Sequence, residues 1–273
     1  MTETEPLLRA RDLRVAFAGT QALGGVSLDI ARGTLFGLIG PNGAGKTTLI
    51  EAVAGFLPQA RGDVIFAGEP VNRLRPDQRV QRGLVRTFQS LELFEDLTVR
   101  ENLLVAAEKR TWLGSVADLA RPGRVRHIDV VEDALELLGL TSEADMMPTQ
   151  LSNGKRKLVA VARALASRAR LVMLDEPAAG LDTAESQELG RHLRAVVDRG
   201  TTMLLVDHDM GLVLGVCDRV HVLDFGQTIA EGTPDEVRAS QRVMTAYLGE
   251  DPGDFDADAG PATTGEENGT GPR

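Results

Sequence analysis

The stretch GPNGAGKTT at 40–48 limits the possible folds of this chain more than any other segment. Gly40, four further residues, and then Gly45, Lys46 and Thr47 complete the pattern of a phosphate-binding loop. Only glycine lets a ring of backbone N–H groups close on phosphate oxygens, and the loop needs a strand before it and a helix after it. Because both flanks have that character, we favour phosphate binding over an ordinary glycine-rich turn. Lys46 would neutralise β/γ-phosphate charge and the Thr47 hydroxyl would hold Mg²⁺.

Strands and helices alternate in the second half of the chain. Apolar runs that end in an acid or a glycine lie at 170–177, 201–209 and 219–226, and helical segments at 183–199 and 210–217 separate them. Strands that alternate with helices predict an α/β fold with a parallel sheet.

The first half has more strand character. Alternating apolar residues over 12–40 predict short strands joined by glycine turns, and RGDVIFAGEPV at 61–71 predicts a hairpin. A helix is expected at 46–56, after the glycine-rich stretch. No internal repeat is visible in the sequence.

From residue 90 to 165 the pattern becomes mostly helical. The spacing predicts helices at 98–108 and 128–138, RPGRV at 121–125 interrupts them, and MMPTQLSNG at 146–154 predicts a loop. A last helix is expected near the end of the chain, because Thr233, Pro234 and Glu236 suit its N-cap, N1 and N3 positions.

Composition limits the compartment and the partners. Cys217 is the only cysteine, which excludes an internal disulfide or a cysteine metal cluster and suits a reducing cytoplasm. No run of about 18 apolar residues is present, and the start MTETEPLLRARDL has acids where a secretory signal has bases. Without a basic excess, nucleic acid is not an expected partner.

The charge is concentrated at one end. The segment 250–273 has seven acids and one arginine, a net charge of −6 out of −10 for the chain, which leaves −4 for residues 1–249. Because this segment is rich in glycine, proline and acids with little that is apolar, we expect it to be a disordered tail.

A second chemical feature is the acid pair that ends LVMLDEP at 171–177. Asp175 and Glu176 would lie at the carboxyl end of a buried strand, where open α/β sheets bind ligands. Adjacent carboxylates there need a cation. We expect Mg²⁺ to be that cation for Asp175, bound through water, and Glu176 to orient or deprotonate a water that attacks the γ-phosphate.

The segment LSNGKRKLVAVARAL at 151–165 has the pattern of an amphipathic helix with an unusual start. Lys155, Arg156 and Lys157 crowd its first turn, where the helix dipole is already positive and each exposed cation costs roughly 0.3–1 kcal/mol. Such a start, with its N–H groups and Ser152, predicts an anion partner.

The ordered set GPNGAGKTT, TFQ (87–89), LSNGK (151–155), LVMLDEP, AGLD (179–182) and DHD (207–209) resembles the ATP-binding subunit of ABC transporters over about residues 8–249. The resemblance implies the P-loop NTPase fold of ABC ATPases within a domain at 1–249. That fold has a mostly parallel core sheet, an N-terminal antiparallel β subdomain and an inserted α-helical subdomain, here at about 90–165.

The resemblance also implies an ATPase with ATP and Mg²⁺ as ligands. Glu176, His208 as the switch histidine at the γ-phosphate, and Lys46 would be catalytic. Mg²⁺ would be held by Thr47, Gln89 and Asp175. ATP would contact these three residues, the aromatic ring of Phe17 at the adenine, and the phosphate-loop residues Gly40, Asn42, Gly43, Ala44, Gly45, Lys46 and Thr48.

In this family the signature loop of one subunit caps the ATP of another. Here that loop would be Ser152, Asn153, Gly154 and Lys155, and Asp182 would be the D-loop residue that contacts the other subunit. Asn153 and Lys155 depart from the commonest signature, LSGGQ. The repulsion around Lys155 and Arg156 would then be relieved only in the closed dimer. The alternative is that the lysines solvate an exposed helix face, which we favour for Lys157 and leave open for Lys155.

Further segments resemble the longer of two ATPase subunits in branched-chain amino-acid importers, notably TFQSLELFEDLTVRENLLVA, the 207–237 segment, the insert around 109–128 and the ending MTAYLGE. The resemblance implies a second ATPase subunit in a homodimer or heterodimer, two membrane-spanning permease subunits and, indirectly, an extracytoplasmic solute-binding protein. The chain would lie on the cytoplasmic side of the membrane as a peripheral subunit. Relatives of this type handle amides and urea as well.

Two other classes are possible. A soluble ABC ATPase of translation would carry two cassettes, and one acting on chromosomes would carry long heptad runs; neither is present in the sequence. A phosphate-loop kinase would not explain LSNGK. Transport is therefore the preferred function.

Overall fold

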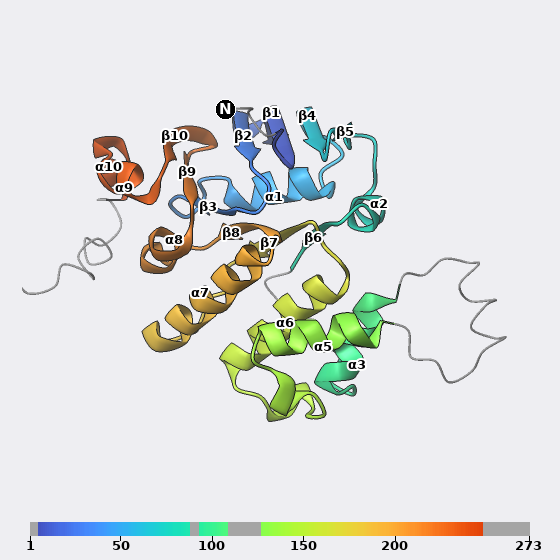
Figure 1. Ribbon diagram of the computed structural model, residues 1–273. Helices are drawn as coiled ribbons and strands as arrows, with labels where there is room; N and C mark the ends of the chain where they lie inside the picture. Colours follow the sequence, from blue (N-terminus) through green and yellow to red (C-terminus); the bar gives the residue numbers. More distant parts are fainter. Residues whose placement is uncertain (1–4, 88–92, 109–126, 248–273) are drawn as a thin grey trace, which may run out of the picture.

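Two β-sheets enclose the first helix. The computed structural model describes residues 5–87, 93–108 and 127–247. Helix α1 (Lys46–Ala54) lies between an antiparallel sheet and a mostly parallel core sheet (Figure 1). The antiparallel sheet has the order β2-β1-β4-β5, with bounds β1 Leu8–Phe17, β2 Thr20–Ile30, β4 Arg61–Phe66 and β5 Glu69–Pro70. This arrangement confirms the predicted fold class.

The core sheet has the order β10-β9-β3-β8-β7-β6, and only β10 pairs antiparallel with its neighbour among these described strands. Phe36 and Leu38 of β3 face α1, whereas Leu35 and Ile39 face the helices on the other side. Because both faces of the sheet are covered there, the central strands β3, β7 and β8 are fully buried and mostly apolar. The bounds are β3 Leu35–Ile39, β6 Leu84–Arg86, β7 Leu171–Asp175, β8 Thr202–Val206, β9 Arg219–Asp224 and β10 Gln227–Gly232.

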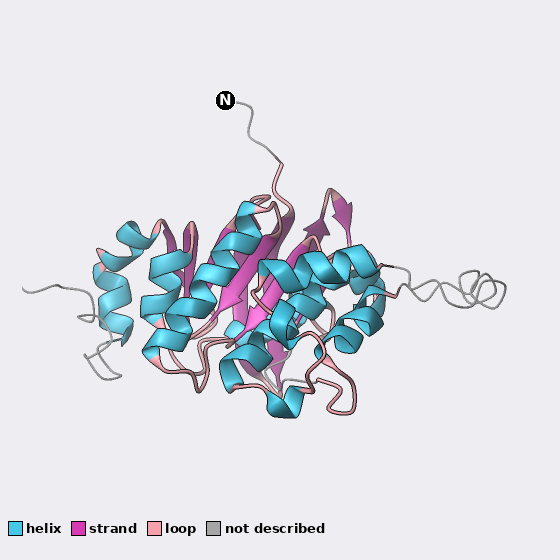
Figure 2. Cartoon of the chain, turned by 60° about the horizontal axis from the view of Figure 1, so that its bottom comes forward, coloured by secondary structure: helices cyan, strands magenta, loops and turns pink. Residues whose placement is uncertain are grey.

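Helices cover the second face of the core sheet (Figure 2). Beside α7 and α8, the helices α3, α5 and α6 pack on one another as a separate group, at the lower right of Figure 1. Their bounds are α3 Val99–Ala107, α5 Ile128–Leu137, α6 Asn153–Ala166, α7 Thr183–Asp198 and α8 Met210–Val216. The smaller helices are α2 Pro76–Gln81, α9 Pro234–Arg238, α10 Gln241–Tyr247 and two 3₁₀ turns, Thr141–Glu143 and Pro148–Gln150.

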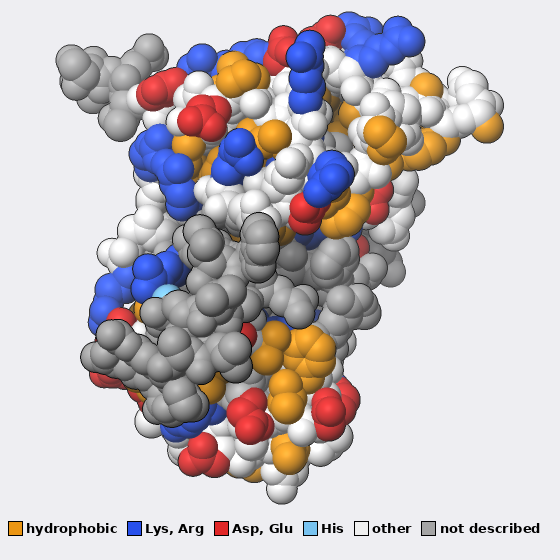
Figure 3. Space-filling view, turned by 90° about the vertical axis from the view of Figure 1, so that its right-hand side faces the viewer, with side chains coloured by type: hydrophobic (Ala, Val, Ile, Leu, Met, Phe, Trp, Pro, Cys, Tyr) orange, Lys and Arg blue, Asp and Glu red, His pale blue; other side chains and the backbone are white. Residues whose placement is uncertain are grey.

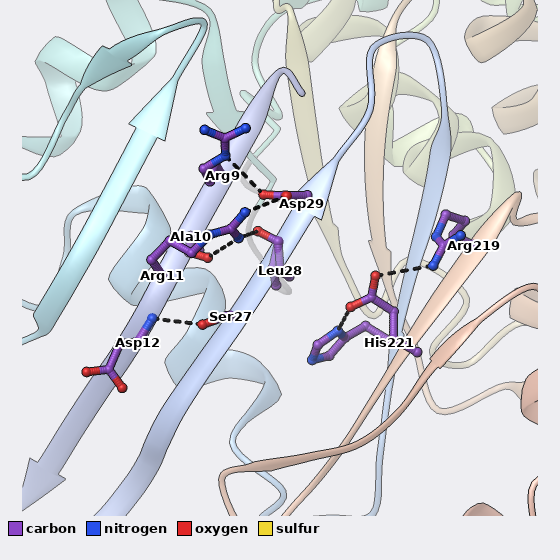
Figure 4. Close-up of polar contacts among 10 residues, drawn as sticks. Arg9, Ala10, Arg11, Asp12, Ser27, Leu28, Asp29, Arg219 and His221 are labelled. Atoms are coloured by element: carbon purple, nitrogen blue, oxygen red, sulfur yellow. Dashed lines mark hydrogen bonds and ion pairs between the residues drawn. The ribbon is translucent and has the colours of Figure 1, made fainter. Parts of the chain in front are cut away.

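Polar side-chain contacts link two pairs of neighbouring strands (Figure 4). Across β1 and β2, Arg9 and Arg11 both contact the carboxylate of Asp29. In the β9–β10 pair, the fully buried His221 ring makes two 2.9 Å hydrogen bonds, one between Nδ1 and the Glu231 carboxylate and one between Nε2 and the Thr228 hydroxyl. The buried ring therefore ties the edge strand β10 to the core sheet.

Several predicted elements are confirmed and some were missed. The strands of 12–40, the 61–71 hairpin, the three later strands, the helices near 46–56, 98–108, 128–138, 183–199 and 210–217, and the Thr233 cap are all present. The predicted 146–154 loop is wrong in part, because it contains a 3₁₀ turn and α6 already begins at Asn153. The short elements α2, β6, β10 and α10 were not predicted. The break at 121–125 and the 250–273 tail lie outside the described residues.

Candidate nucleotide site

The glycine-rich loop, Asp175, Glu176 and His208 are brought to one edge of the core sheet. Parallel strands end at a common edge, and the neighbours β3, β8, β7 and β6 are followed there by the glycine-rich loop, DHD, the acid pair and Thr87. Residues from four distant parts of the sequence therefore share this edge, which is where open α/β sheets bind ligands.

The loop between β3 and α1 depends on its glycines. A Cβ added to Gly40 would lie 2.2 Å from the carbonyl oxygen of Leu223, and one on Gly45 would lie 2.7 Å from that of Ala22. Gly45 is also the N-cap of α1 with φ of 101°, a conformation that favours glycine. The loop backbone can therefore pack against β2 and β9 while its N–H groups remain available at the start of α1.

Lys46 lies folded over this loop. The residue is buried, and its Nζ donates to the carbonyl oxygens of Pro41, at 3.1 Å, and of Gly40. These bonds hold the ammonium above the loop backbone. The other predicted loop residues lie on the same loop or in the first turn of α1: Asn42, Gly43, Ala44, Thr47 and Thr48.

Asp175 ends β7 and is only 5% exposed. The sequence predicted Mg²⁺ as its cation, but the structure places a guanidinium beside it: Arg86 Nη2 is 2.8 Å from Asp175 Oδ2. Arg86 Nη1 also lies 3.5 Å from Glu51 of α1. Arg86 was not among the predicted site residues, although it directly precedes TFQ and ends the strand next to β7.

Glu176 follows in an uncommon backbone conformation. Its φ is +49°, and its N–H donates to the carbonyl of Val206 at 2.7 Å. A non-glycine residue at positive φ costs on the order of 1–3 kcal/mol, and such strain is concentrated at functional sites. The N–H of Glu176 is thus still bonded to the last residue of β8, one residue beyond the end of β7.

The loop after β8 is organised by Asp207, which is fully buried. Its Oδ1 accepts from the N–H groups of His208 at 2.8 Å and Asp209 at 3.1 Å, and its Oδ2 accepts from the N–H of Ala178 at 2.9 Å. The His208 side chain is 62% exposed. Asp207, for which no role was predicted, thus holds the histidine loop against the loop after β7.

We call residues 176–182, between β7 and α7, the β7–α7 loop. It ends at Asp182, the N-cap of α7, whose carboxylate accepts from the N–H of Glu185 at 2.9 Å. The helix start thus fixes Asp182, which remains exposed.

The start of α6 differs from the expectation. Ser152 is the N-cap, and its hydroxyl accepts from the N–H of Lys155 at 3.3 Å. The three cations that follow all have partners within the chain: Lys155 pairs with Glu143, Arg156 with Glu95, and Lys157 donates to the carbonyl of Ala179. The expectation that repulsion around Lys155 and Arg156 is relieved only in a dimer is therefore wrong.

Lys157 also contradicts its sequence interpretation as a solvated residue, because it is only 8% exposed. Burial lowers the pKa of its ammonium, while the carboxylates of Asp207, Glu185 and Glu176 oppose that shift. At Glu143, the hydrogen bond from Lys155 lowers the carboxyl pKa.

Phe17 and Gln89 were also predicted to contact ATP. Phe17, at the end of β1, is 44% exposed, so its ring is not part of the core. Gln89 lies outside the described residues.

Known proteins are similar to this chain over most of its length. A family model described as ABC transporter matches residues 23–179, and one described as branched-chain amino acid ATP-binding cassette transporter matches residues 227–252. The high-affinity branched-chain amino acid transport ATP-binding protein LivG of Salmonella typhimurium is 37% identical over 253 residues, which cover 90% of this chain and 99% of LivG.

Two further relatives widen the comparison. The lipopolysaccharide export system ATP-binding protein LptB of Escherichia coli is 34% identical, over 89% of this chain and 98% of LptB. A crystal structure of an ABC transporter ATP-binding cassette in its ADP conformation aligns with a TM-score of 0.80 and 32% identity, over 90% of this chain and 100% of that one.

Proposed function

The chain belongs to the ABC transporter family as an ATP-binding and ATP-hydrolysing subunit, and from that premise we propose that it powers an importer of branched-chain amino acids or related amides or urea. The proposed solute class rests on the match of residues 227–252 to the branched-chain family model. The likeness to LptB, an export protein, makes transport direction the point to test.

The proposed chemistry uses the loops at the sheet edge. The glycine-rich loop and Lys46 bind the phosphates, and Phe17 stacks on the adenine. Glu176 accepts a proton from the attacking water, and the exposed His208 contacts the γ-phosphate. The strained backbone of Glu176, directly after the last residue of β7, supports this role because such strain is concentrated at functional sites.

The residues at this edge suit Mg²⁺, which prefers hard oxygen ligands. Thr47 supplies a hydroxyl and Asp175 a carboxylate, with Gln89 as the third proposed ligand. Bound there, Mg²⁺ would offset the charge of the phosphates. Arg86 shares the Asp175 carboxylate and so limits how its oxygens turn.

We further propose that a second ATPase subunit completes the site, in a homodimer or heterodimer. Ser152, Asn153, Gly154 and Lys155 would contact the partner's ATP, and Asp182 would contact the partner subunit. Support comes from their position: α6 belongs to the helical group apart from α1 and the glycine-rich loop (Figure 1). The proposed domain is 1–249, with the helical subdomain at about 90–165.

The remaining proposed partners are two permease subunits and, through them, a solute-binding protein, with this chain at the cytoplasmic face of the membrane. None of the helices in the described ranges is long and apolar enough to span a membrane. Figure 3 shows small groups of hydrophobic side chains among charged ones on the face that it draws. Exposed large apolar residues in the described part include Phe56, Val80, Phe94 and Val105.

The test is uptake by cells that lack the gene. Cells are complemented with the wild type or with Glu176→Gln, and uptake of radiolabelled leucine, valine and urea is measured. We expect the wild type alone to restore uptake of one of these solutes. Normal uptake without the gene, together with a defect in export of an envelope component, would overturn the import proposal.

A further inference from the structure

Lys157 is a buried cation that joins two elements. It lies on α6, and its Nζ donates to the carbonyl oxygen of Ala179 in the β7–α7 loop. An ammonium withdrawn from water is costly unless it is well partnered. Because the partner is a backbone carbonyl of another element, the contact fixes the position of the loop against the helix.

A second contact repeats the connection one turn earlier. Asn153 Nδ2 donates to the carbonyl oxygen of Gly180 at 3.3 Å. Asn153 and Lys157 are four residues apart, so they lie on the same face of α6. That face thus holds two successive carbonyl groups of the loop.

The other side of the loop is held by Asp207, whose Oδ2 accepts from the N–H of Ala178 at 2.9 Å. Lys157 also lies in the field of the carboxylates of Asp207, Glu185 and Glu176. The loop is therefore clamped between a buried cation on α6 and a buried anion after β8. Lys155 and Arg156 do not share this role, because they pair with Glu143 and Glu95.

We propose that Lys157 is a positioning residue that locks the start of α6 to the β7–α7 loop, so that the signature residues and Asp182 meet the second subunit as one unit. This inference rests on the proposed function, in which the signature residues face the partner's ATP and Asp182 contacts the partner subunit. Without the Nζ group, one of the two bonds between this face of α6 and the loop would be lost, and the partner's ATP would be capped less well.

The first experiment separates binding from dimerisation. In a Glu176→Gln background, Lys157→Met keeps most of the aliphatic stem and removes the ammonium. We expect ATP affinity within about twofold of the parent and ATP-dependent dimerisation at least about tenfold weaker, as for the loss of a charged hydrogen bond. Lys157→Arg should recover most of the dimer, and Arg191→Met on α7 is the charge-matched control.

Equal dimerisation by Lys157→Met and its parent would overturn the inference. A parent that binds ATP without dimerising would instead contradict the proposed dimer, and the inference with it.

The second experiment tests whether Lys157 affects hydrolysis of the ATP bound by its own chain or of the ATP bound by the partner chain. Two differently tagged chains are co-purified as dimers with one working phosphate loop each, and ATP hydrolysis is measured. When Lys157→Met and Lys46→Ala are in different chains, the working loop faces a native α6. When both changes are in one chain beside a wild-type chain, the working loop faces the α6 that carries Lys157→Met. We expect hydrolysis in the first pair and a loss of at least about tenfold in the second. The reverse pattern, or equal loss in both, would show an effect on the chain's own site or on folding, and would overturn the proposal.

Discussion

At the scale of the residue, Glu176 combines a carboxylate at the site edge with a strained and anchored backbone. Glu176→Gln keeps the size and the backbone but removes the proton acceptor. We expect ATP binding to be unchanged, turnover to fall at least about a hundredfold, and an ATP-bound dimer to accumulate. Calorimetry, phosphate release and size-exclusion chromatography measure the three quantities. Glu188→Gln, on the exposed face of α7, is the control, and near-normal turnover would remove Glu176 from the mechanism.

Arg86 makes a separate prediction about stability. Its side chain and that of Asp175 are 9% and 5% exposed, so they form a buried ion pair. Removing one partner of a buried pair typically costs about 3–5 kcal/mol, because the other charge is left unpaired. We expect Arg86→Met to lower the free energy of unfolding by about that amount, and the double change Arg86→Met/Asp175→Asn to recover part of the loss. Urea denaturation monitored by circular dichroism measures this, and an unchanged midpoint would contradict it.

Single residues also show where sequence reasoning stops. The glycine-rich loop, the acid pair and the Thr233 cap could be predicted because each depends on neighbours within about ten residues. Arg86 and Lys157 could not, because their partners Asp175 and Ala179 lie 89 and 22 positions away. A local pattern assigns such cations to the surface, and only tertiary packing supplies the acceptor that lets them be buried.

At the scale of the element, the start of α6 is an N-terminus whose cations are already paired. Lys155 is bonded to Glu143, whose side chain is 9% exposed. Lys155→Gln should therefore lower the free energy of unfolding by roughly 1 kcal/mol, because Glu143 loses its cation. Adding Glu143→Gln should recover most of that lost stability. If thermal denaturation shows that the double variant loses the sum of the two single losses, the ion pair does not contribute to stability.

The same helix start provides a test of the proposed contact with the partner's ATP. The exchange Lys155→Glu/Glu143→Lys recreates the ion pair but places a carboxylate where the γ-phosphate would approach, and like charges there cost several kcal/mol. We expect wild-type stability and ATP binding, but no ATP-driven dimer in a Glu176→Gln background. If this double variant dimerises as well as Lys155→Gln, the role of Lys155 is limited to its ion pair with Glu143, and the residue does not face the partner's ATP.

In the β9–β10 pair, the hydrogen bond from His221 holds the pKa of Glu231 below its ordinary value of 4.5, with Arg219 as a further cause. A lowered carboxyl pKa stabilises the fold above the ordinary value, and that contribution is lost as the pH falls below it. Glu231→Gln should therefore be less stable than wild type at neutral pH, and the difference should shrink below pH 4.5. Urea midpoints across that range test this; a difference that is constant with pH would contradict it.

The short elements that were not predicted share a physical cause. Strand β6 has three residues and exists because it pairs with β7, while β10 is a polar edge strand held by β9. Helix α2 has six residues, and Arg79 is buried there because its guanidinium donates to the carbonyls of Ala52 and Val53 at the end of α1. Long periodic segments can be predicted from their own sequence, whereas these short segments form only where they pack on other elements.

At the scale of the whole molecule, the core sheet separates two hydrophobic cores, one with α1 and the antiparallel sheet and one with the remaining large helices. The glycine-rich loop belongs to the first side, and α6 is in the helical group on the second. Lys157 and Asp207 hold the β7–α7 loop between them. A displacement of the helical group would therefore act on the sheet edge through this loop.

The acidic end of the chain bears on how much of the molecule is needed for this function. The family models match no residue beyond 252, and residues 253–273 contain five acids, one arginine and little that is apolar. Such a composition cannot supply a core, and its negative charge would oppose approach to ATP or to an anionic membrane surface. We expect deletion of 253–273 to leave the thermal midpoint and the ATPase rate within error, and to leave transporter assembly intact when the complex is purified from membranes. A variant that neutralises the five acids without shortening the chain separates charge from length. Loss of assembly in the deletion, but not in the neutralised variant, would show that this segment is an interaction element and would contradict the prediction.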